Sequence, residues 1–283
     1  MTSAVLTEAL AKQLTRCSRE LSRARLGVVR GVHQARVASR RLREGIGALD
    51  SALPSDIRRR LLKMLRELCR TLGAVRECDV TMALAATEAA QHEWPAESVA
   101  LITAALEAER ARHHRALVKT LTDSKWRSAF VPVRNRFRQM HDGVNHAEAL
   151  GSARGRRMRR ARTLGRDVSE LGALYVPDRL HAVRIATKKL RYALEWEQQI
   201  GRRAWVRERR VLEAAQEELG EWHDRLVLQE RIHRLRRSGD FPKPVASDFK
   251  RMAADLEREC RAMHAAVLGR VPAILRVTEV AQK

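Results

Sequence analysis

Aromatic residues are scarce in this chain of 283 residues, where Phe, Trp and Tyr make up 4% of the sequence. Strands favour aromatic and β-branched residues, and many proteins that hold nucleic-acid bases stack them on aromatic rings. The composition therefore disfavours both a β-sandwich and a base-stacking platform. Hydrophobic residues nevertheless make up 45%, so the chain can bury sizeable cores built mainly from Leu, Val, Ile and Ala.

Paired cysteines and long apolar runs are also missing. The widely separated cysteines form no CxxC pair, which argues against a disulfide framework and for a reduced, intracellular protein. Glu8 and Lys12 interrupt the start of the chain before a signal-peptide core could form, and no apolar run approaches the length of a membrane span. We therefore expect a cytoplasmic protein with no membrane partner. The cysteines are Cys17, Cys69, Cys78 and Cys260.

Motifs of catalysis and metal binding are lacking as well. The sequence has no P-loop GxxxxGK(S/T), no HExxH and no nucleophile elbow. The adjacent His113 and His114 point in different directions on a helix, and His141, Asp142 and His146 lie where we expect a linker. We therefore expect no metal, no cofactor and no enzymatic activity.

Positive charge is the strongest signal in the sequence. Lys and Arg number 56 against 34 Asp and Glu, which gives a formal net charge of +22 at pH 7. Most of these cations are Arg, whose guanidinium group forms two-pronged hydrogen bonds to phosphate. Such a field repels itself unless anions neutralise it, so we expect a partner rich in phosphate.

Apolar residues recur at helical spacing along almost the whole chain, which predicts an all-α fold. The segment 141–155 mixes Gly, Asn and Ser and is the expected linker in a single domain of two repeats, an N-terminal bundle over 1–140 and a C-terminal bundle over 156–283. Asp178 is the expected cap of one helix, and the tail after Pro272 is expected to be loosely held. The predicted helices cover 7–26, 31–53, 55–72, 81–91, 95–121, 126–140, 178–200, 204–237 and 246–268.

Two blocks of sequence occur twice, in the same order. Residues 32–43, VHQARVASRRLR, align without a gap with residues 180–191, LHAVRIATKKLR, with five of twelve positions identical. LGAVRECDV, from Leu72, aligns with LGEWHDRLV, from Leu219, at nearly the same separation. Two matched blocks at one offset indicate an internal duplication.

The first block of each repeat places its cations on one side of a helix. At about 100° per residue, the basic side chains fall within an arc of about 80°, opposite an apolar seam. Like charges one turn apart destabilise a helix unless an anion lies between them. The alternatives are a solvated basic surface and, for the histidines, a polar residue of the core. The residues are His33, Arg36, Arg40 and Arg43 in the first repeat and His181, Arg184, Lys188 and Arg191 in the second.

With Asp178 as the cap, His181 lies in the first turn of its helix, where the helix dipole favours an anion over a charged imidazole. A bound anion should raise the pKa of His181. We therefore expect tighter anion binding at mildly acidic pH.

These blocks resemble the CHAD family, the conserved histidine α-helical domain. The resemblance rests on HQARVASRRLR from His33, LGAVRECDV from Leu72, HAVRIATKKLRYALE from His181 and LGEWHDRLV from Leu219. It implies two four-helix bundles related by a pseudo-twofold axis, with a central basic groove that binds inorganic polyphosphate without turnover. Polyphosphate granules and polyphosphate-metabolising enzymes are the further partners that it implies.

The resemblance also assigns residues. It places the two basic rows in the groove and adds Arg76 and His223. Arg41 and Lys189 lie about 80° around their helices from His33 and His181 and are secondary candidates. Asp79 and Asp224 are expected to orient basic groups, although Glu77 stands where the family usually has Asp. The run 154–162 either extends the groove, through Arg156, Arg159 and Arg160 on one helix side, or forms a solvated arm. A nucleic-acid-binding protein is the alternative function, since net charge alone supports it equally well.

Overall fold

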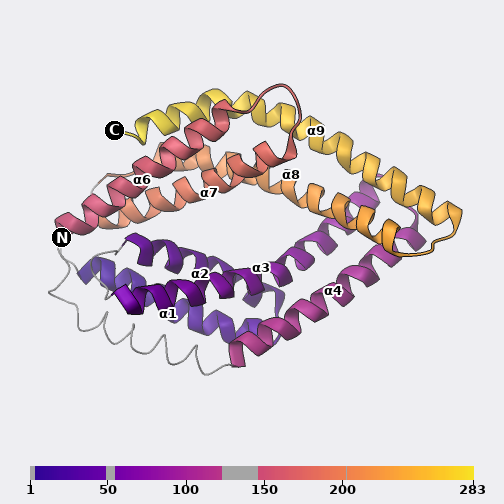
Figure 1. Ribbon diagram of the computed structural model, residues 1–283, viewed down its shortest axis with the longest axis horizontal. Helices are drawn as coiled ribbons and strands as arrows, with labels where there is room; N and C mark the ends of the chain where they lie inside the picture. Colours follow the sequence, from indigo (N-terminus) through magenta and orange to yellow (C-terminus); the bar gives the residue numbers. More distant parts are fainter. Residues whose placement is uncertain (1–3, 49–54, 123–145, 202) are drawn as a thin grey trace.

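The computed structural model in Figure 1 describes residues 4–48, 55–122, 146–201 and 203–283. Every regular element in these ranges is an α-helix, in agreement with the predicted all-α fold. None of them combines the length and the apolar composition that a transmembrane helix needs. The helices are α1 (Ala4–Arg25), α2 (Val29–Ala48), α3 (Ser55–Gln91), α4 (Ala96–Thr122), α6 (His146–Ser169), α7 (Pro177–Ile200), α8 (Val206–Ser238) and α9 (Lys243–Val280).

The two parts of the chain repeat one pattern of helix contacts. In the first, α1 contacts α2, α2 contacts α3, α3 contacts α4, and α4 returns to α1. In the second, α6, α7, α8 and α9 contact one another in the same cyclic order. The turn from α1 to α2 is made at Gly27, whose φ of 77° suits glycine, and the N–H of Gly27 donates to the carbonyl of Ala24.

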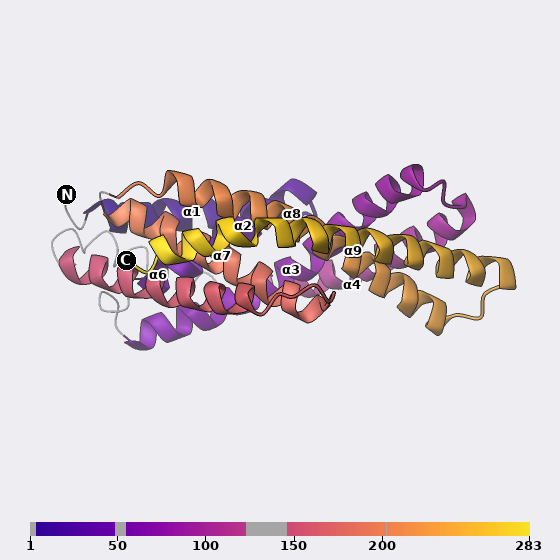
Figure 2. The ribbon, with the colours of Figure 1, turned by 90° about the horizontal axis from the view of Figure 1, so that it is seen from above.

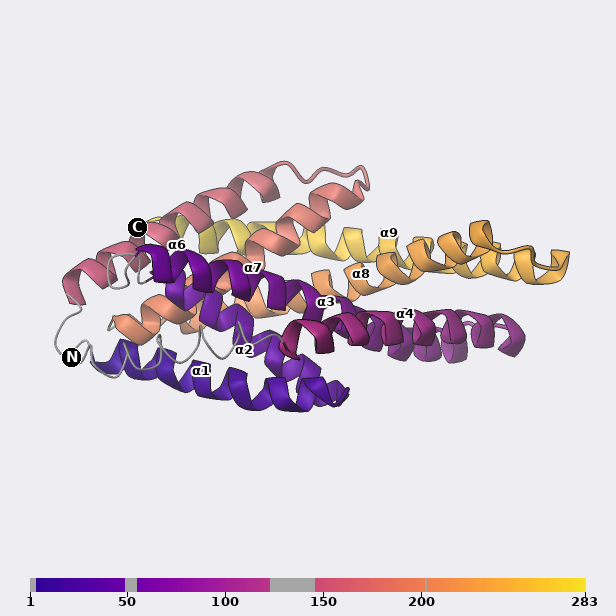
Figure 3. The ribbon, with the colours of Figure 1, turned by 60° about the horizontal axis from the view of Figure 1, so that its bottom comes forward.

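The long helices extend beyond the short ones. Figures 1 and 2 show the α3–α4 and α8–α9 hairpins meeting at one end of the molecule, with α1, α2, α6 and α7 gathered at the other. In Figure 3 the two hairpins again lie side by side along their outer parts. The element contacts agree, because α3 contacts α8 and α4 contacts both α8 and α9.

Four apolar clusters hold these helices together. One lies within α1–α4, around Leu72, and one within α6–α9, around Leu219. The other two cross between the repeats: Phe249 of α9 packs with Trp94 and Ile102 at the hairpin tips, and Trp196 of α7 packs among α1, α2 and α3. The repeats are therefore joined at both ends, and the middle turns of α2, α3, α7 and α8 lie between the two crossing cores.

Several expected boundaries differ from the observed helices. The linker prediction fails for residues 146–155, which belong to α6, and residues 141–145 and the helix expected at 126–140 lie outside the described residues. The predicted interruption at 72–80 is wrong, because α3 runs straight through it. Asp178 is not the cap of α7, which begins at Pro177 after the N-cap Val176. The tail after Pro272 is helical to Val280, since Ile274 and Val277 are buried against the core.

Candidate anion-binding site

The two basic rows predicted from the repeat face each other across α2 and α7. The charge of Arg36 on α2 acts on Arg184 of α7, and Lys188 of α7 lies within the field of both Arg36 and Arg40. Direct contacts between α2 and α7 hold these rows together. Side chains of like charge from the two halves of the chain are therefore collected in one place.

The second repeated block contributes to the same place. Arg76 of α3 acts on His33, and the ring of His223 of α8 lies 5.1 Å from the ring of His181, centroid to centroid. Eight of the ten side chains predicted with the basic rows thus lie together. We call this set the central basic cluster: His33, Arg36, Arg40, Arg76, His181, Arg184, Lys188 and His223.

Burial and mutual repulsion lower the pKa values of several basic groups in the cluster. Burial, and next the charge of Arg184, lowers the pKa of Lys188 to about 6. Burial and Arg184 likewise lower the pKa of His223 to about 3, so this imidazole is neutral at physiological pH. Burial and the neighbouring Arg40 lower the pKa of Arg36 to about 10. Each of these shifts disfavours the charged form, and a bound anion would reverse them.

Polar nitrogen atoms in the cluster lack partners. Among the described residues, the buried Nε donors of Arg36 and Arg184 and the buried Nδ1 of His223 have no hydrogen-bond partner. In the described ranges, the side chains of Arg36, Arg40, Arg184 and Lys188 make no ion pair at salt-bridge distance. A buried donor without a partner destabilises the folded protein by about 1–3 kcal/mol. An oxyanion that accepts hydrogen bonds from these arginine donors would remove that cost, which would favour its binding.

Two carboxylates lie near the cluster, so its surroundings are not purely cationic. Asp224 of α8 and Glu77 of α3 both raise the pKa of Arg184, although burial lowers it overall. Burial in turn raises the pKa of Asp224. Asp79 instead forms an ion pair of 2.5 Å with Arg110, whose Nη2 donates to the carbonyl of Gly27 over 3.0 Å. Asp79 therefore orients a basic group, as expected, and secures the α1–α2 turn.

The last members of the two rows differ from the rest. Arg43 lies 3.7 Å from Glu44, and Arg191 donates to Glu195 and, over 2.9 Å, to Gln216. These two arginines therefore have acidic neighbours, unlike Arg36 and Arg40 within the described ranges. Glu195 lies one turn further along α7, at the i,i+4 spacing of a helical ion pair, so the spacing in the sequence could have indicated this partner of Arg191.

The arginines of α6 form a separate group. Arg156 donates to the carbonyl of Gly47 and lies 3.4 Å from Glu44. Arg159 and Arg160 act on the charge of Arg156, while Arg157 is buried and pairs with Glu197 at 2.6 Å. These contacts make Arg156 and Arg157 structural. Lys189 lies half-buried on α7, about 100° around the helix from Lys188, and Arg41 pairs with Glu195 at 3.7 Å.

Two groups of His, Cys and carboxylate side chains have atoms close enough to hold a metal ion, a geometry that the sequence did not indicate. In each of them an arginine already supplies the positive charge. Arg225 pairs with Glu88 at 3.0 Å and with Glu259, and Arg231 pairs with Glu109 at 3.0 Å. These arginines join α8 to α3, α4 and α9. The groups are Glu88, His92 and Glu259, and Cys78, Glu109 and His113.

These observations define an all-helical protein of two similar halves with a shared cationic centre. The chain belongs to the CHAD domain family, whose model matches residues 8–233. Among solved structures it is similar to the CHAD domain from the plant Ricinus communis, at 23% identity and a TM-score of 0.68 over 96% of this chain and 91% of that one. It is also similar to PptA from Streptomyces chartreusis, at 17% identity and a TM-score of 0.66 over 100% and 99%. No curated protein matches the sequence.

Proposed function

We propose that the protein binds inorganic polyphosphate at the central basic cluster and does not hydrolyse it. The observation that carries the proposal is the convergence of unpaired cations from both halves, with Arg36 and Arg184 as its clearest members. Membership of the CHAD domain family supports the same ligand.

A long anion suits the cluster better than a single phosphate. His33 and Arg40 are seven residues apart on α2, as are His181 and Lys188 on α7, which corresponds to about 10 Å along each helix. A single phosphate can satisfy only part of such a row. A chain of phosphates can neutralise all of it and releases counterions as it binds, so affinity should fall steeply with salt.

Binding without turnover fits the carboxylates of the site. Phosphoryl transfer needs carboxylates that hold magnesium beside the phosphate. Asp224 instead lies in the field of Arg184, Lys188 and Arg76, all of which lower its pKa against the effect of burial. Incubation of the protein with polyphosphate and magnesium should therefore release no phosphate.

The decisive experiment replaces Arg36, Arg40 and Arg184 together by Gln and measures polyphosphate binding by titration calorimetry. We expect a loss of affinity of at least about 100-fold, from three lost charge-assisted hydrogen-bonding groups. The control variant replaces Arg251, Arg258 and Arg261 by Gln. These exposed arginines of α9 form local pairs with carboxylates, so the control removes the same net charge and should lose only a few-fold. Equal losses in both variants, or loss of helicity in the first alone, would contradict the proposal.

Competition separates polyphosphate from nucleic acid, which the net charge of +22 would also attract. Long-chain polyphosphate should displace a labelled single-stranded oligonucleotide at equal phosphate concentration, whereas the oligonucleotide should displace polyphosphate poorly. The reverse ranking would identify a nucleic-acid-binding protein.

A further inference from the structure

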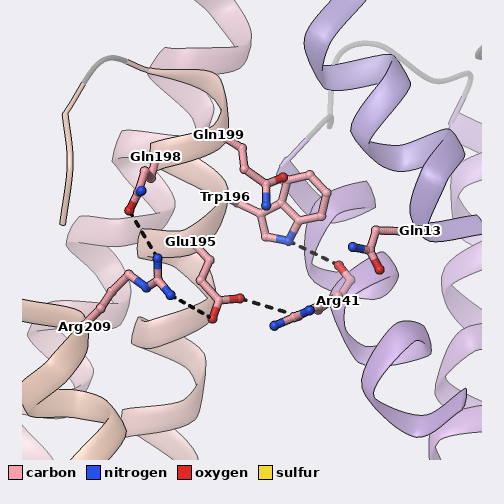
Figure 4. Close-up of a pocket in the computed structure, with 7 residues that line it drawn as sticks. All are labelled: Gln13, Arg41, Glu195, Trp196, Gln198, Gln199 and Arg209. Carbon is pink, nitrogen blue, oxygen red and sulfur yellow. Dashed lines mark hydrogen bonds and ion pairs between the residues drawn. The ribbon is translucent and has the colours of Figure 1, made fainter. Parts of the chain in front are cut away.

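A polar cavity lies between α1, α2, α7 and α8. Its volume is about 260 Å³, and its lining includes Gln13, Arg41, Glu195, Gln198 and Arg209 (Figure 4). Only the two arginines and one glutamate among the lining residues carry charge. The cavity is formed by both halves of the chain, like the cluster itself.

Glu195 lies among three arginines that come from three helices. Its carboxylate accepts a hydrogen bond from Arg191 of α7 and lies 3.7 Å from Arg41 of α2 and 4.0 Å from Arg209 of α8. Figure 4 shows Arg41 and Arg209 approaching it from opposite sides. Glu213 adds a second carboxylate, 3.7 Å from Arg191 and 3.3 Å from Arg209. Because these distances, like those from Glu195 to Arg41 and Arg209, exceed those of good ion pairs, the two carboxylates serve the three guanidinium groups incompletely.

Atoms at the cavity wall confirm that the coordination is incomplete. The buried Nε of Arg41, Nε of Arg209 and Oε1 of Gln13 have no hydrogen-bond partner in the part of the chain that the structure describes. Arg209 otherwise donates to Gln198 and Glu213, each over 3.3 Å. Two arginine donors thus remain unsatisfied next to a cavity that can admit a group larger than a carboxylate. A tetrahedral phosphate carries more acceptor oxygens and more charge than Glu195 supplies.

Residues of α7 connect this cavity to the surroundings of the central basic cluster. Arg191 follows Lys188 by about one turn of α7, and its guanidinium lies over the ring of Tyr192, 4.6 Å from the centroid. The side chain of Tyr192 in turn acts on the charge of Arg36. A polyanion that leaves the cluster along α7 therefore meets Arg191 first and the Glu195 carboxylate next.

We propose that Arg41, Arg191 and Arg209 form an outer phosphate subsite, which the carboxylate of Glu195 occupies in the ligand-free protein. The phosphate that enters belongs to the same polyanion that the central basic cluster binds, so this inference rests on the proposed function. Glu195 then acts as an internal competitor. Chains too short to reach beyond Lys188 do not displace it, and longer chains do.

The test replaces Glu195 by Gln, which removes the charge and keeps the size of the side chain. The affinity for long-chain polyphosphate should rise by about five-fold, because a phosphate no longer competes with a carboxylate for hydrogen bonds to charged groups. The affinity for tripolyphosphate should change much less. The control is Glu257→Gln, which makes the same change of net charge by breaking an exposed pair with Arg261 on α9. Equal affinities of the two variants for long chains overturn the proposal.

A second substitution tests the arginines themselves. Arg209→Gln should lower the affinity of the wild-type protein for long chains, and in the Glu195→Gln background it should cancel the gain. A gain that survives Arg209→Gln overturns the subsite, even if the Glu195 variant is less stable. If the wild-type protein binds no polyphosphate, the proposed function fails, and inorganic phosphate then tests the subsite by itself. Phosphate should raise the melting temperature of Glu195→Gln more than that of Glu257→Gln, and equal shifts exclude the subsite.

Discussion

The buried cations of this protein fall into two regions that differ in their partners. At the contacts between helices, arginines are matched with carboxylates: Arg157 with Glu197 at 2.6 Å, and Arg225 with Glu88 at 3.0 Å. In the central basic cluster, Arg36 and Arg184 have buried Nε atoms with no hydrogen-bond partner among the described residues. The molecule neutralises a buried arginine where the arginine serves the fold. The central cations without ion pairs are therefore a stronger reason to propose a ligand site than the net charge is.

The first prediction concerns the paired region and has the largest effect on stability. Arg157 is 3% exposed, pairs with Glu197, donates to the carbonyl of Ala281 and lies over the ring of Trp205. Replacing Arg157 by Met should lower the free energy of unfolding by about 3–5 kcal/mol, because Glu197 remains buried without a counter-charge. Urea denaturation followed by circular dichroism measures the change.

The matched variant in the other region is Arg184→Met. It removes a half-buried guanidinium that makes no ion pair at salt-bridge distance with any described residue, although its charge acts on Asp224. The free energy of unfolding should therefore change by much less than in Arg157→Met. A loss of stability similar to that of Arg157→Met would mean that the two regions do not differ, and the central arginines would then be structural.

The second prediction concerns binding instead of stability, and here the larger effect is expected in the central basic cluster. Arg184→Gln should weaken polyphosphate binding by about 1.5–3 kcal/mol, the usual contribution of a hydrogen bond to a charged group. The slope of log K against log salt should become shallower by about one unit, since one fewer counterion is released. Isothermal titration at several salt concentrations measures both. Arg225→Gln changes the net charge equally, and an equal effect on the slope would contradict the comparison.

The sequence predicts the unpaired region far better than the paired one. The two repeated blocks carry basic residues at the same helical spacing, which is enough to place His33, Arg36, His181 and Arg184 on corresponding helix faces. The fold brings those faces together. The ion pair of Arg225 with Glu88 joins α8 to α3 across the two halves, and no local spacing encodes it. The polyphosphate-binding role of His33, Arg36, His181 and Arg184 stays a prediction.

The mispredicted linker at 146–155 has a physical cause. Glycines at 151 and 155 favoured a linker, yet α6 includes both, because Ala149 and Ala153 are buried in the core that joins the halves. Each glycine costs a helix about 1 kcal/mol relative to Ala. Tertiary burial of neighbouring residues outweighs that cost, and the sequence alone does not reveal which neighbours will be buried.

The third prediction is a pH dependence centred on Lys188. In the ligand-free protein its pKa is about 6, with Arg184, Arg40, Arg36 and Asp224 as its charged neighbours. A bound polyanion favours the charged ammonium group, so binding takes up a proton above pH 6. Affinity should therefore increase by up to about ten-fold per pH unit as the pH falls from 8 to 6. Burial and neighbouring cations also lower the pKa of His181, which adds uptake in the same direction.

The same lowered pKa has a consequence for the stability of the ligand-free protein. The unfolded chain keeps Lys188 protonated up to about pH 10.5, so it binds more protons than the folded chain between about pH 6 and 10.5. The contribution of Lys188 to the free energy of unfolding therefore rises with pH across this window. Lys188→Met should stabilise the protein more at pH 6 than at pH 9, and it should flatten the pH dependence of binding. An affinity that stays constant between pH 6 and 8 in the wild-type protein would exclude the mechanism.

The smallest effect is expected at Gly220, the counterpart of Gly73 in the second repeated block. Gly220 shares a face of α8 with Gln216 and His223, and a Cβ atom there would meet no other atom within 4 Å. Gly220→Ala should raise the free energy of unfolding by about 1 kcal/mol through helix propensity. If the polyanion lies along this face, the methyl group occupies space that the ligand needs, and affinity falls a few-fold. Gly269→Ala on α9 has equally open surroundings and should stabilise the protein without weakening binding. Equal binding by both variants would move the ligand away from α8 and confine it to the rows of α2 and α7.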